Sequence, residues 1–119
     1  MEKKLQPRKN QMTEALQILG LARRAGSVAP GTSATRRSII QGDARVVLMA
    51  EDASSAQLDK IKRTMRKRII PQVFLGDRAT LGAAIGKAPI AAVAVTDASL
   101  AGRLLESIDA EIMVDEGRD

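Results

Sequence analysis

Three short, mostly apolar runs constrain the fold of this chain more than any other feature. They cover residues 46–50, 72–75 and 91–95. Each run is continuous rather than alternating, which is typical of strands that are buried on both faces of a sheet. Amphipathic, helix-like segments lie between and around the runs. This succession predicts an α/β sandwich.

Five helices and one further strand complete the expected arrangement. The first helix is predicted over residues 12–24 and ends near Gly26, since glycine is a common residue just past a helix end. Residues 27–29 are predicted to form a short edge strand. The second helix is expected to begin near Thr32. Asp52 or Ser54 is expected to cap the third helix, and Asp77 and Asp97 are expected to cap the last two.

The composition excludes several classes of function. The 119-residue chain has no Cys and no His, so disulfides, zinc-finger sites and Ser-His-Asp catalysis are absent. It has one Phe and no Trp or Tyr, which removes aromatic platforms for base stacking. No nucleophile–base pair can be nominated, and we expect no catalytic residue, no cofactor and no metal site.

No apolar run is long enough to span a membrane, and no signal-peptide pattern opens the chain, which favours a cytoplasmic protein.

The formal net charge of +5 favours a polyanionic partner. Residues 1–11 are expected to form a basic N-terminal arm and residues 110–119 an acidic C-terminal tail. The domain between them, residues 12–109, keeps a surplus of cations. A basic surface of this kind attracts phosphate backbones without reading their sequence.

The stretch "PGTSATRRSII", residues 30–40, is the first candidate site. If a helix begins near Thr32, Ser33 and Arg37 are four residues apart and lie on the same exposed face. Such a helix start has free backbone N–H groups that attract anions. A capped helix with a solvated face and an anion-binding surface both fit the pattern.

Two other stretches invite a functional interpretation. The run "KIKRTMRKR", residues 60–68, is the densest positive charge, and it fits either a solvated helix face or a set of phosphate contacts. The stretch "GAAIGKAP", residues 82–89, is not a phosphate-binding P-loop, because only three residues separate its glycines and Ala88 follows Lys87. Packing of a helix against a strand explains its glycines better.

Several stretches together resemble a known family: "LGLARRAGSV", "GTSATRRSIIQGDARVVLMAEDAS", "IIPQVFLGDRATLGAAIGK" and "AAVAVTD". They resemble the kink-turn RNA-binding ribosomal protein family (the "L seven Ae / L thirty e" group), most closely its bacterial YlxQ-like branch. The resemblance covers about residues 12–108. It implies a three-layer α/β/α sandwich around a four-stranded mixed sheet, and a non-catalytic RNA-binding protein of ribosomal type. We also expect a monomer that contacts structured RNA, kink-turn-like or ribosomal, and the ribosome.

In this family the start of the second helix enters a kink-turn, and an apolar loop before the last strand makes a second contact. The resemblance implies RNA contacts at Gly31, Thr32, Ser33, Ala34, Arg37, Lys87, Ala88, Pro89 and Ile90, and we expect the neighbouring Arg36 to contact RNA as well. The family pattern has Asn-Glu, the pair that reads guanine edges, where this chain has Ser33 and Ala34. The departure predicts weaker or less selective kink-turn binding than a member with Asn-Glu would show. The alternative function is a ribosome- or transcription-associated protein-interaction module that does not bind RNA directly.

Overall fold

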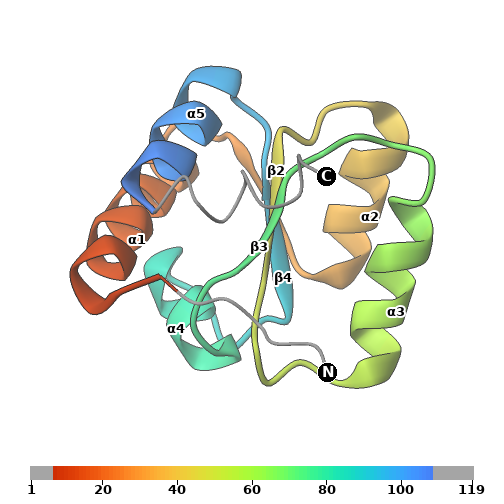
Figure 1. Ribbon diagram of the computed structural model, residues 1–119, viewed down its shortest axis with the longest axis horizontal. Coiled ribbons are helices and arrows are strands. Elements are labelled where there is room, and N and C mark those ends of the chain that lie inside the picture. Colours follow the sequence, from red (N-terminus) through yellow and green to blue (C-terminus); the bar gives the residue numbers. More distant parts are fainter. Residues whose placement is uncertain (1–6, 109–119) are drawn as a thin grey trace, which may run out of the picture.

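The computed structural model describes residues 7–108, which form three layers around one central sheet (Figure 1). Helices α1, α4 and α5 cover one face of the sheet, and α2 and α3 cover the other. In chain order the elements are α1 (Lys9–Arg24), β1 (Val28–Pro30), α2 (Thr32–Gln41), β2 (Val46–Met49), α3 (Ser55–Thr64), β3 (Gln72–Phe74), α4 (Arg78–Ala84), β4 (Ala92–Val95) and α5 (Ala98–Ser107). The predicted sandwich with a four-stranded mixed sheet is confirmed.

The strand order of the sheet is β1-β4-β2-β3. Strand β4 runs antiparallel to β1 and β2, whereas β2 and β3 are parallel. The two central strands, β2 and β4, are buried along their whole length, which explains why their sequences are continuously apolar. Strand β1 lies at an edge, where Pro30 costs no central ladder hydrogen bond.

The sheet separates two apolar cores. Along β2, Val46 and Leu48 pack toward α1, α4 and α5, whereas Val47 and Met49 pack toward α2 and α3. The alternation follows from the period of two along a strand. Each face of β2 is therefore packed against one of the two helical layers.

Helix α1 begins at Lys9, earlier than the predicted start at residue 12. The side chain of Gln11 accepts a hydrogen bond from the backbone N–H of Arg8 at 2.8 Å, and the N–H of Met12 donates to the carbonyl of Arg8 at 2.8 Å. The first turn is polar and largely exposed. Apolar periodicity therefore does not reveal it.

The predicted arm and tail are only partly covered by the structure. Of the arm, residues 7–11 are described, and residues 9–11 already belong to α1. The predicted acidic tail, residues 110–119, lies outside the described residues. Within residues 7–108, none of the helices has the length and apolar character needed to cross a membrane.

Candidate nucleic-acid interface

The start of α2 is fixed by a glycine in a conformation that other residues rarely adopt. Gly31 has φ 93° and ψ 163° and forms the N-cap of the helix. Its N–H donates to the carbonyl of Ala92 at 2.8 Å, and its own carbonyl accepts from the N–H of Thr35 at 2.9 Å. Gly31 thus turns the chain from the edge strand β1 into α2 while staying bonded to β4.

The first turn of α2 leaves its backbone donors open. No hydrogen bond from the N–H of Thr32, Ser33 or Ala34 is found within residues 7–108, and Gly31 has no side chain to cap them. Three other helices fill the equivalent position with side-chain oxygens. These caps are Ser54 on α3, Asp77 on α4 and Asp97 on α5. The start of α2 is therefore available to an external anion.

The start of α4 shows the opposite arrangement. Asp77 accepts from the N–H of Thr80 at 2.8 Å, and Asp52 accepts from the N–H of Arg78 at 2.9 Å. Asp52 also pairs with the Arg78 guanidinium at 3.4 Å. The prediction that Asp52 or Ser54 caps α3 is correct for Ser54 alone, because Asp52 binds α4 instead. Two carboxylates of the protein itself occupy the start of this helix.

Ser33 and Arg37 lie on the exposed side of α2, as their spacing predicts. Thr35, Ser38 and Ile39 form the buried side, with exposed fractions of 0%, 5% and 0%. The hydroxyl of Thr35 donates to the carbonyl of Ala29 at 3.2 Å and so fixes the rotation of the helix. The exposed line therefore passes from open N–H groups to a hydroxyl and then to a guanidinium.

Thr32 and Ala34 have no exposed polar side-chain group for a ligand. The hydroxyl oxygen of Thr32 is buried and has no hydrogen-bond partner in the described part of the chain. Ala34 is half-buried and brings no polar group. Both residues present their backbone N–H groups as the polar atoms for a ligand.

Arg36 points away from the Ser33–Arg37 line. Its Nε donates to the hydroxyl of Thr64 on α3 at 2.9 Å, and the side chain is half-buried. Adjacent helical residues diverge by about 100°, so Arg36 and Arg37 cannot both follow one line. The sequence motif gave no sign of Thr64, which lies on another helix.

The second predicted segment, Lys87 to Ile90, lies beside the start of α2. Ala91 and Ala92 follow it directly in the chain. The carbonyl of Ala91 accepts from the N–H of Ala50 at 2.8 Å, and the carbonyl of Ala92 accepts from the N–H of Gly31. Lys87, Ala88 and Pro89 are exposed and Ile90 is half-buried. The structure thus brings the two predicted contact segments to the same end of the sheet.

Gly82, in α4, determines the path of this loop. The N–H of Lys87 donates to the carbonyl of Gly82 at 2.8 Å, and the N–H of Ile90 donates to the carbonyl of Arg78 at 3.2 Å. A Cβ at Gly82 would overlap the carbonyl of Ala88 and lie 2.8 Å from the carbonyl oxygen of Lys87. The glycine therefore allows the loop backbone to rest directly on α4, a role that sequence patterning alone did not identify.

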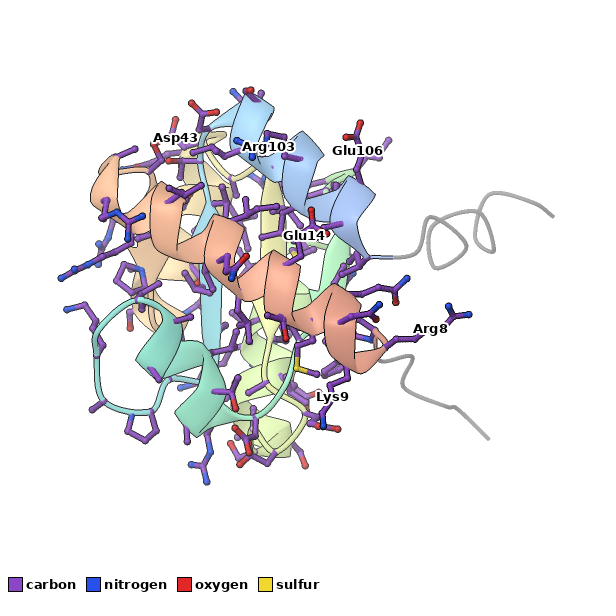
Figure 2. All side chains as sticks on the ribbon, turned by 90° about the vertical axis from the view of Figure 1, so that its left-hand side faces the viewer. Arg8, Lys9, Glu14, Asp43, Arg103 and Glu106 are labelled. Atoms are coloured by element: carbon purple, nitrogen blue, oxygen red, sulfur yellow. The ribbon has the colours of Figure 1, made fainter. Side chains whose placement is uncertain are left out.

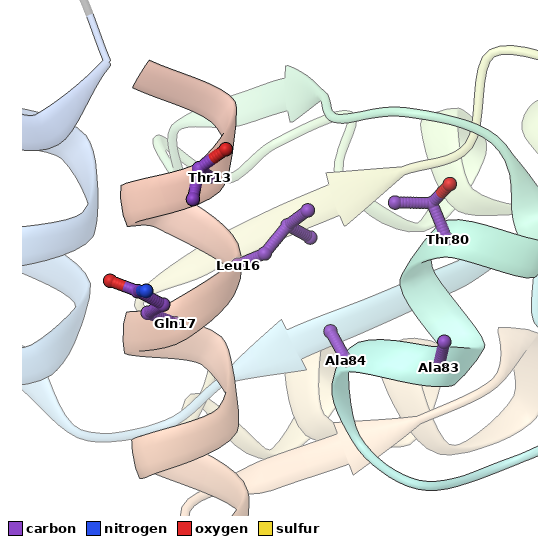
Figure 3. A pocket seen from close by; sticks show the side chains of 6 residues that line it. All are labelled: Thr13, Leu16, Gln17, Thr80, Ala83 and Ala84. Carbon is purple, nitrogen blue, oxygen red and sulfur yellow. The ribbon is translucent and has the colours of Figure 1, made fainter. Parts of the chain in front are cut away.

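A hollow of about 470 Å³ lies between α1 and α4, in the other helical layer (Figure 3). Its lining is apolar with a few uncharged polar groups. The lining residues are Thr13, Leu16, Gln17, Thr80, Ala83 and Ala84. No cation lines this hollow, so we do not include it in the candidate anion-binding surface. No cluster of His, Cys, Asp and Glu suited to a metal ion is found within residues 7–108.

Comparison with known proteins places the chain in a family. The model of the "Ribosomal protein L7Ae/L30e/S12e/Gadd45 family" matches residues 13–104. The chain is 37% identical over 92 residues to the RNA-binding protein YlxQ of Bacillus subtilis, which covers 77% of this chain and 92% of that protein. It is 28% identical over 96 residues to the large ribosomal subunit protein eL8 of Thermoplasma volcanium, which covers 80% and 79%.

Solved structures agree with this fold. A protein of unknown function from Bacillus halodurans superimposes with a TM-score of 0.75 at 30% identity, covering 81% of this chain and 97% of that one. The Giardia lamblia 15.5kD RNA binding protein superimposes with a TM-score of 0.71 at 16% identity, covering 86% and 90%. The second match supports the fold alone.

Proposed function

This chain belongs to the ribosomal protein L7Ae/L30e/S12e/Gadd45 family, and we propose that it binds structured RNA through the first turn of α2 and the adjoining loop. The primary surface consists of Gly31 to Ala34, Arg37 and the loop from Lys87 to Ile90. Its role is binding without catalysis. The ribosomal and RNA-binding relatives support this proposal.

One observation carries the proposal: α2 has an uncapped first turn beside an exposed cation. The N–H groups of Thr32, Ser33 and Ala34 have no partner in the described part of the chain, whereas α3, α4 and α5 are capped by their own side chains. A helix start of this kind stabilises an exposed anion by roughly 0.3–1 kcal/mol. Arg37 adds a charge-assisted donor one turn further on. The arrangement suits a phosphate, or another acceptor of RNA, better than a neutral ligand.

The residues present favour backbone contacts over base reading. By analogy with DNA, each good pair with a base edge contributes about 1–3 kcal/mol of discrimination. Contacts to phosphates alone typically leave dissociation constants of about 10⁻⁴–10⁻⁶ M. Ser33 has one hydroxyl and Ala34 has none, so we propose kink-turn binding that is weaker or less selective than Asn-Glu would give.

The family relationship also suggests where the protein acts. Ribosomal relatives make ribosomal RNA, or RNA bound to the ribosome, the proposed target in the cytoplasm. We propose that one copy of the chain binds one RNA site, because the surface is complete within a single chain. The loop and the start of α2 come from the same sheet end and need no second subunit.

Titration with a kink-turn RNA and with an unkinked duplex of the same composition tests the proposal. We expect binding to the kink-turn in the micromolar range at physiological salt, with a preference over the duplex that is smaller than tenfold, about 1.4 kcal/mol. Absence of binding to both RNAs at low salt would refute RNA binding. Nanomolar, kink-selective binding would refute the weakening assigned to Ser33 and Ala34.

Two charge reversals distinguish a defined surface from diffuse attraction. Arg37→Glu should abolish binding, because it puts a carboxylate beside the open N–H groups. Arg66→Glu changes the net charge equally at an exposed position beyond the end of α3, and should reduce only the salt-dependent part of the affinity. Equal losses from both variants would indicate diffuse electrostatic binding.

A second candidate, docking of a protein partner without RNA, is favoured by one specific observation. Ile40 and Ile69 have exposed fractions of 58% and 101%. Ile69 lines a hollow of about 280 Å³ at the far end of α2, together with Arg45 and Arg68. A stable protein partner in a pull-down, together with no shift of mixed-sequence RNA at low salt, would support this candidate over the first.

A further inference from the structure

The helical layer of α2 and α3 carries a large surplus of cations. Its segments, residues 32–45 and 54–70, contain only Asp43 and Asp59 as acids. No ion pair involving a cation of these segments is found within residues 7–108. The cations are Arg36, Arg37, Arg45, Lys60, Lys62, Arg63, Arg66, Lys67 and Arg68. The charge of this layer is therefore free to attract an external polyanion.

The opposite helical layer has a smaller surplus, since α1, α5 and the preceding Arg8 hold the acids Glu14 and Glu106 against the cations Arg8, Lys9, Arg23, Arg24 and Arg103. Figure 2 shows the face formed by α1 and α5, where Glu14 and Glu106 lie among Arg8, Lys9 and Arg103. Mixed charges of this kind partly cancel beyond a Debye length of about 8–10 Å. The basic character of the described domain is concentrated on the side of α2.

Thr64 holds two of the cations of the α2–α3 layer in place. Its hydroxyl accepts from Arg36 Nε at 2.9 Å and donates to the carbonyl of Lys60 at 2.8 Å. Its carbonyl accepts from Arg68 Nη1 at 3.3 Å. Arg36 and Arg68 thus lie at the junction of the two helices with part of their conformational freedom already lost, which lowers the cost of binding a phosphate.

The junction continues from the primary surface. Helices α2 and α3 run side by side in the same direction, and α2 starts at the sheet end where the loop from Lys87 to Ile90 lies (Figure 1). Lys60 and Arg63 lie at helical spacing on the side of α3 that also carries Thr64, and Lys67 follows in the turn beyond the end of the helix. A helix of ten residues such as α2 is about 15 Å long, which is the length of roughly four base steps along a DNA duplex.

From this arrangement we propose that the junction of α2 and α3 is a track for the phosphate backbone of an RNA duplex arm. The track consists of Arg36, Lys60, Arg63, Lys67 and Arg68. It extends the proposed RNA surface, on which this inference rests, and it contacts the arm that leaves the primary site. It adds affinity without adding sequence preference, since it contacts phosphates only.

Two triple variants with the same change of charge test the track. The track variant is Lys60→Gln/Arg63→Gln/Lys67→Gln, and the control variant is Lys9→Gln/Arg24→Gln/Arg103→Gln on the opposite layer. All six side chains are exposed, and none makes a side-chain hydrogen bond or ion pair in the described part of the chain. Each protein is titrated with a kink-turn RNA with short arms and with the same RNA after one arm is extended by one helical turn.

The extended RNA should separate the two variants. Each phosphate contact contributes about 0.7–0.9 to the slope of log affinity against log salt, so three lost contacts lower the slope by about 2–3. The advantage of the unmodified protein over the track variant should then shrink by roughly 20- to 40-fold between about 50 and 200 mM salt. The control variant should keep the unmodified slope, and both variants should bind the short-armed RNA as the unmodified protein does.

Several results would overturn the track. It fails if the control variant loses as much as the track variant, or if the track variant loses as much on the short-armed RNA as on the extended one. It also fails if the unmodified protein gains nothing from the longer arm. Absence of binding to either RNA by the unmodified protein would overturn the proposed function as well, whereas normal binding with no effect of the track variant would overturn the track alone.

A single substitution tests the role of Thr64 without changing any charge. Thr64→Val removes the hydroxyl that accepts from Arg36 and keeps the shape of the side chain. We expect weaker binding of the extended RNA with an unchanged salt slope, because all cations remain but Arg36 is no longer held. An unchanged affinity would show that Thr64 does not position the track.

Discussion

The N–H of Gly31 donates to the carbonyl oxygen of Ala92 at 2.8 Å, and this bond joins the two segments of the proposed RNA surface. Gly31 precedes the first turn of α2, whereas Ala92 opens β4 and is separated from the loop from Lys87 to Ile90 by Ala91 alone. The bond extends the pairing of edge strand β1 with β4 by one position beyond Pro30. The distance between the two segments is therefore set by the sheet.

Replacing Gly31 by alanine should lower both stability and RNA affinity. The φ of 93° and ψ of 163° belong to a region that only glycine occupies readily, and a non-glycine residue there costs about 1–3 kcal/mol. Space is not the reason, since a Cβ at this position would meet nothing within 4 Å. We expect the free energy of unfolding, measured with urea, to fall by that amount, and the affinity for a kink-turn RNA to fall with it.

Gly26→Ala is the matched control for this substitution. Gly26 also has a positive φ, 74°, and open space around its Cβ position, but it follows α1 rather than preceding α2. The variant should lose a comparable amount of stability, about 1–2 kcal/mol, and bind RNA normally when folded. If Gly31→Ala binds RNA as tightly as Gly26→Ala does, the backbone at the start of α2 is not part of the site.

Gly82→Ala should disturb the loop from Lys87 to Ile90. Alanine normally stabilises a helix interior by about 0.5–1 kcal/mol relative to glycine. Here the added Cβ would overlap the carbonyl of Ala88, and backbone cannot move aside as a flexible side chain can. We expect destabilisation of about 1–3 kcal/mol in urea unfolding, and weaker RNA binding by the folded fraction.

Gly102→Ala provides the comparison for this substitution within α5. A Cβ at Gly102 would meet nothing within 4 Å, so the ordinary helix effect should appear as a gain of about 0.5–1 kcal/mol. RNA binding should not change. A gain in stability from both substitutions would contradict the close contact between α4 and the loop.

The sequence supported the prediction of most elements because each depends on local patterns. The apolar runs gave the strands, and Ser54, Asp77 and Asp97 gave three helix starts. Contacts between elements distant in the chain could not be predicted in the same way. Asp52 resembles a local cap but binds Arg78, and its partner follows from the parallel pairing of β2 with β3 rather than from spacing.

The candidate site shows the same division. Spacing correctly placed Ser33 and Arg37 on the exposed side of α2. Arg36 was expected among the RNA-contact residues beside Arg37, whereas packing of α2 on α3 directs Arg36 to Thr64. The adjacency of the loop from Lys87 to Ile90 came from the family resemblance, because no local pattern encodes which strand lies beside β1. Side-chain partners on a second helix depend on how the two helices pack, and a single sequence does not display that.

Acidification should weaken the start of α4 through Asp77. Its hydrogen bonds with Thr80 hold the pKa of the Asp77 carboxyl below its ordinary value. Because the pKa is lower in the folded protein than in the unfolded chain, where it is about 3.9, the carboxylate contributes stability above that pH. This contribution is lost as the pH falls through the folded-state pKa.

Urea unfolding across the acid range measures this effect. The unmodified protein should lose stability on acidification more steeply than Asp77→Asn, which keeps a capping oxygen but does not titrate. Asp77→Ala should be less stable than both at neutral pH, since it leaves the N–H of Thr80 without its acceptor. Identical acid profiles for the unmodified protein and Asp77→Asn would contradict the lowered pKa.

Restoring the family's Asn-Glu pair, as Ser33→Asn/Ala34→Glu, should increase selectivity for a kink-turn over an unkinked duplex. The pair supplies side-chain groups for base edges at about 1–3 kcal/mol each, or roughly 5- to 150-fold per contact. The added carboxylate also repels phosphates, so affinity for the duplex should fall while affinity for the kink-turn rises. A carboxylate in the uncapped first turn of α2 is favourable for the helix itself by about 0.3–1 kcal/mol, so the double variant should remain folded.

Ala98→Glu, at the exposed first position of α5, adds the same charge away from the proposed RNA surface and should leave the ratio of the two affinities unchanged. A double variant whose ratio matches that of Ala98→Glu would show that Ser33 and Ala34 do not lie against the bases, and that the first turn of α2 contacts only the RNA backbone.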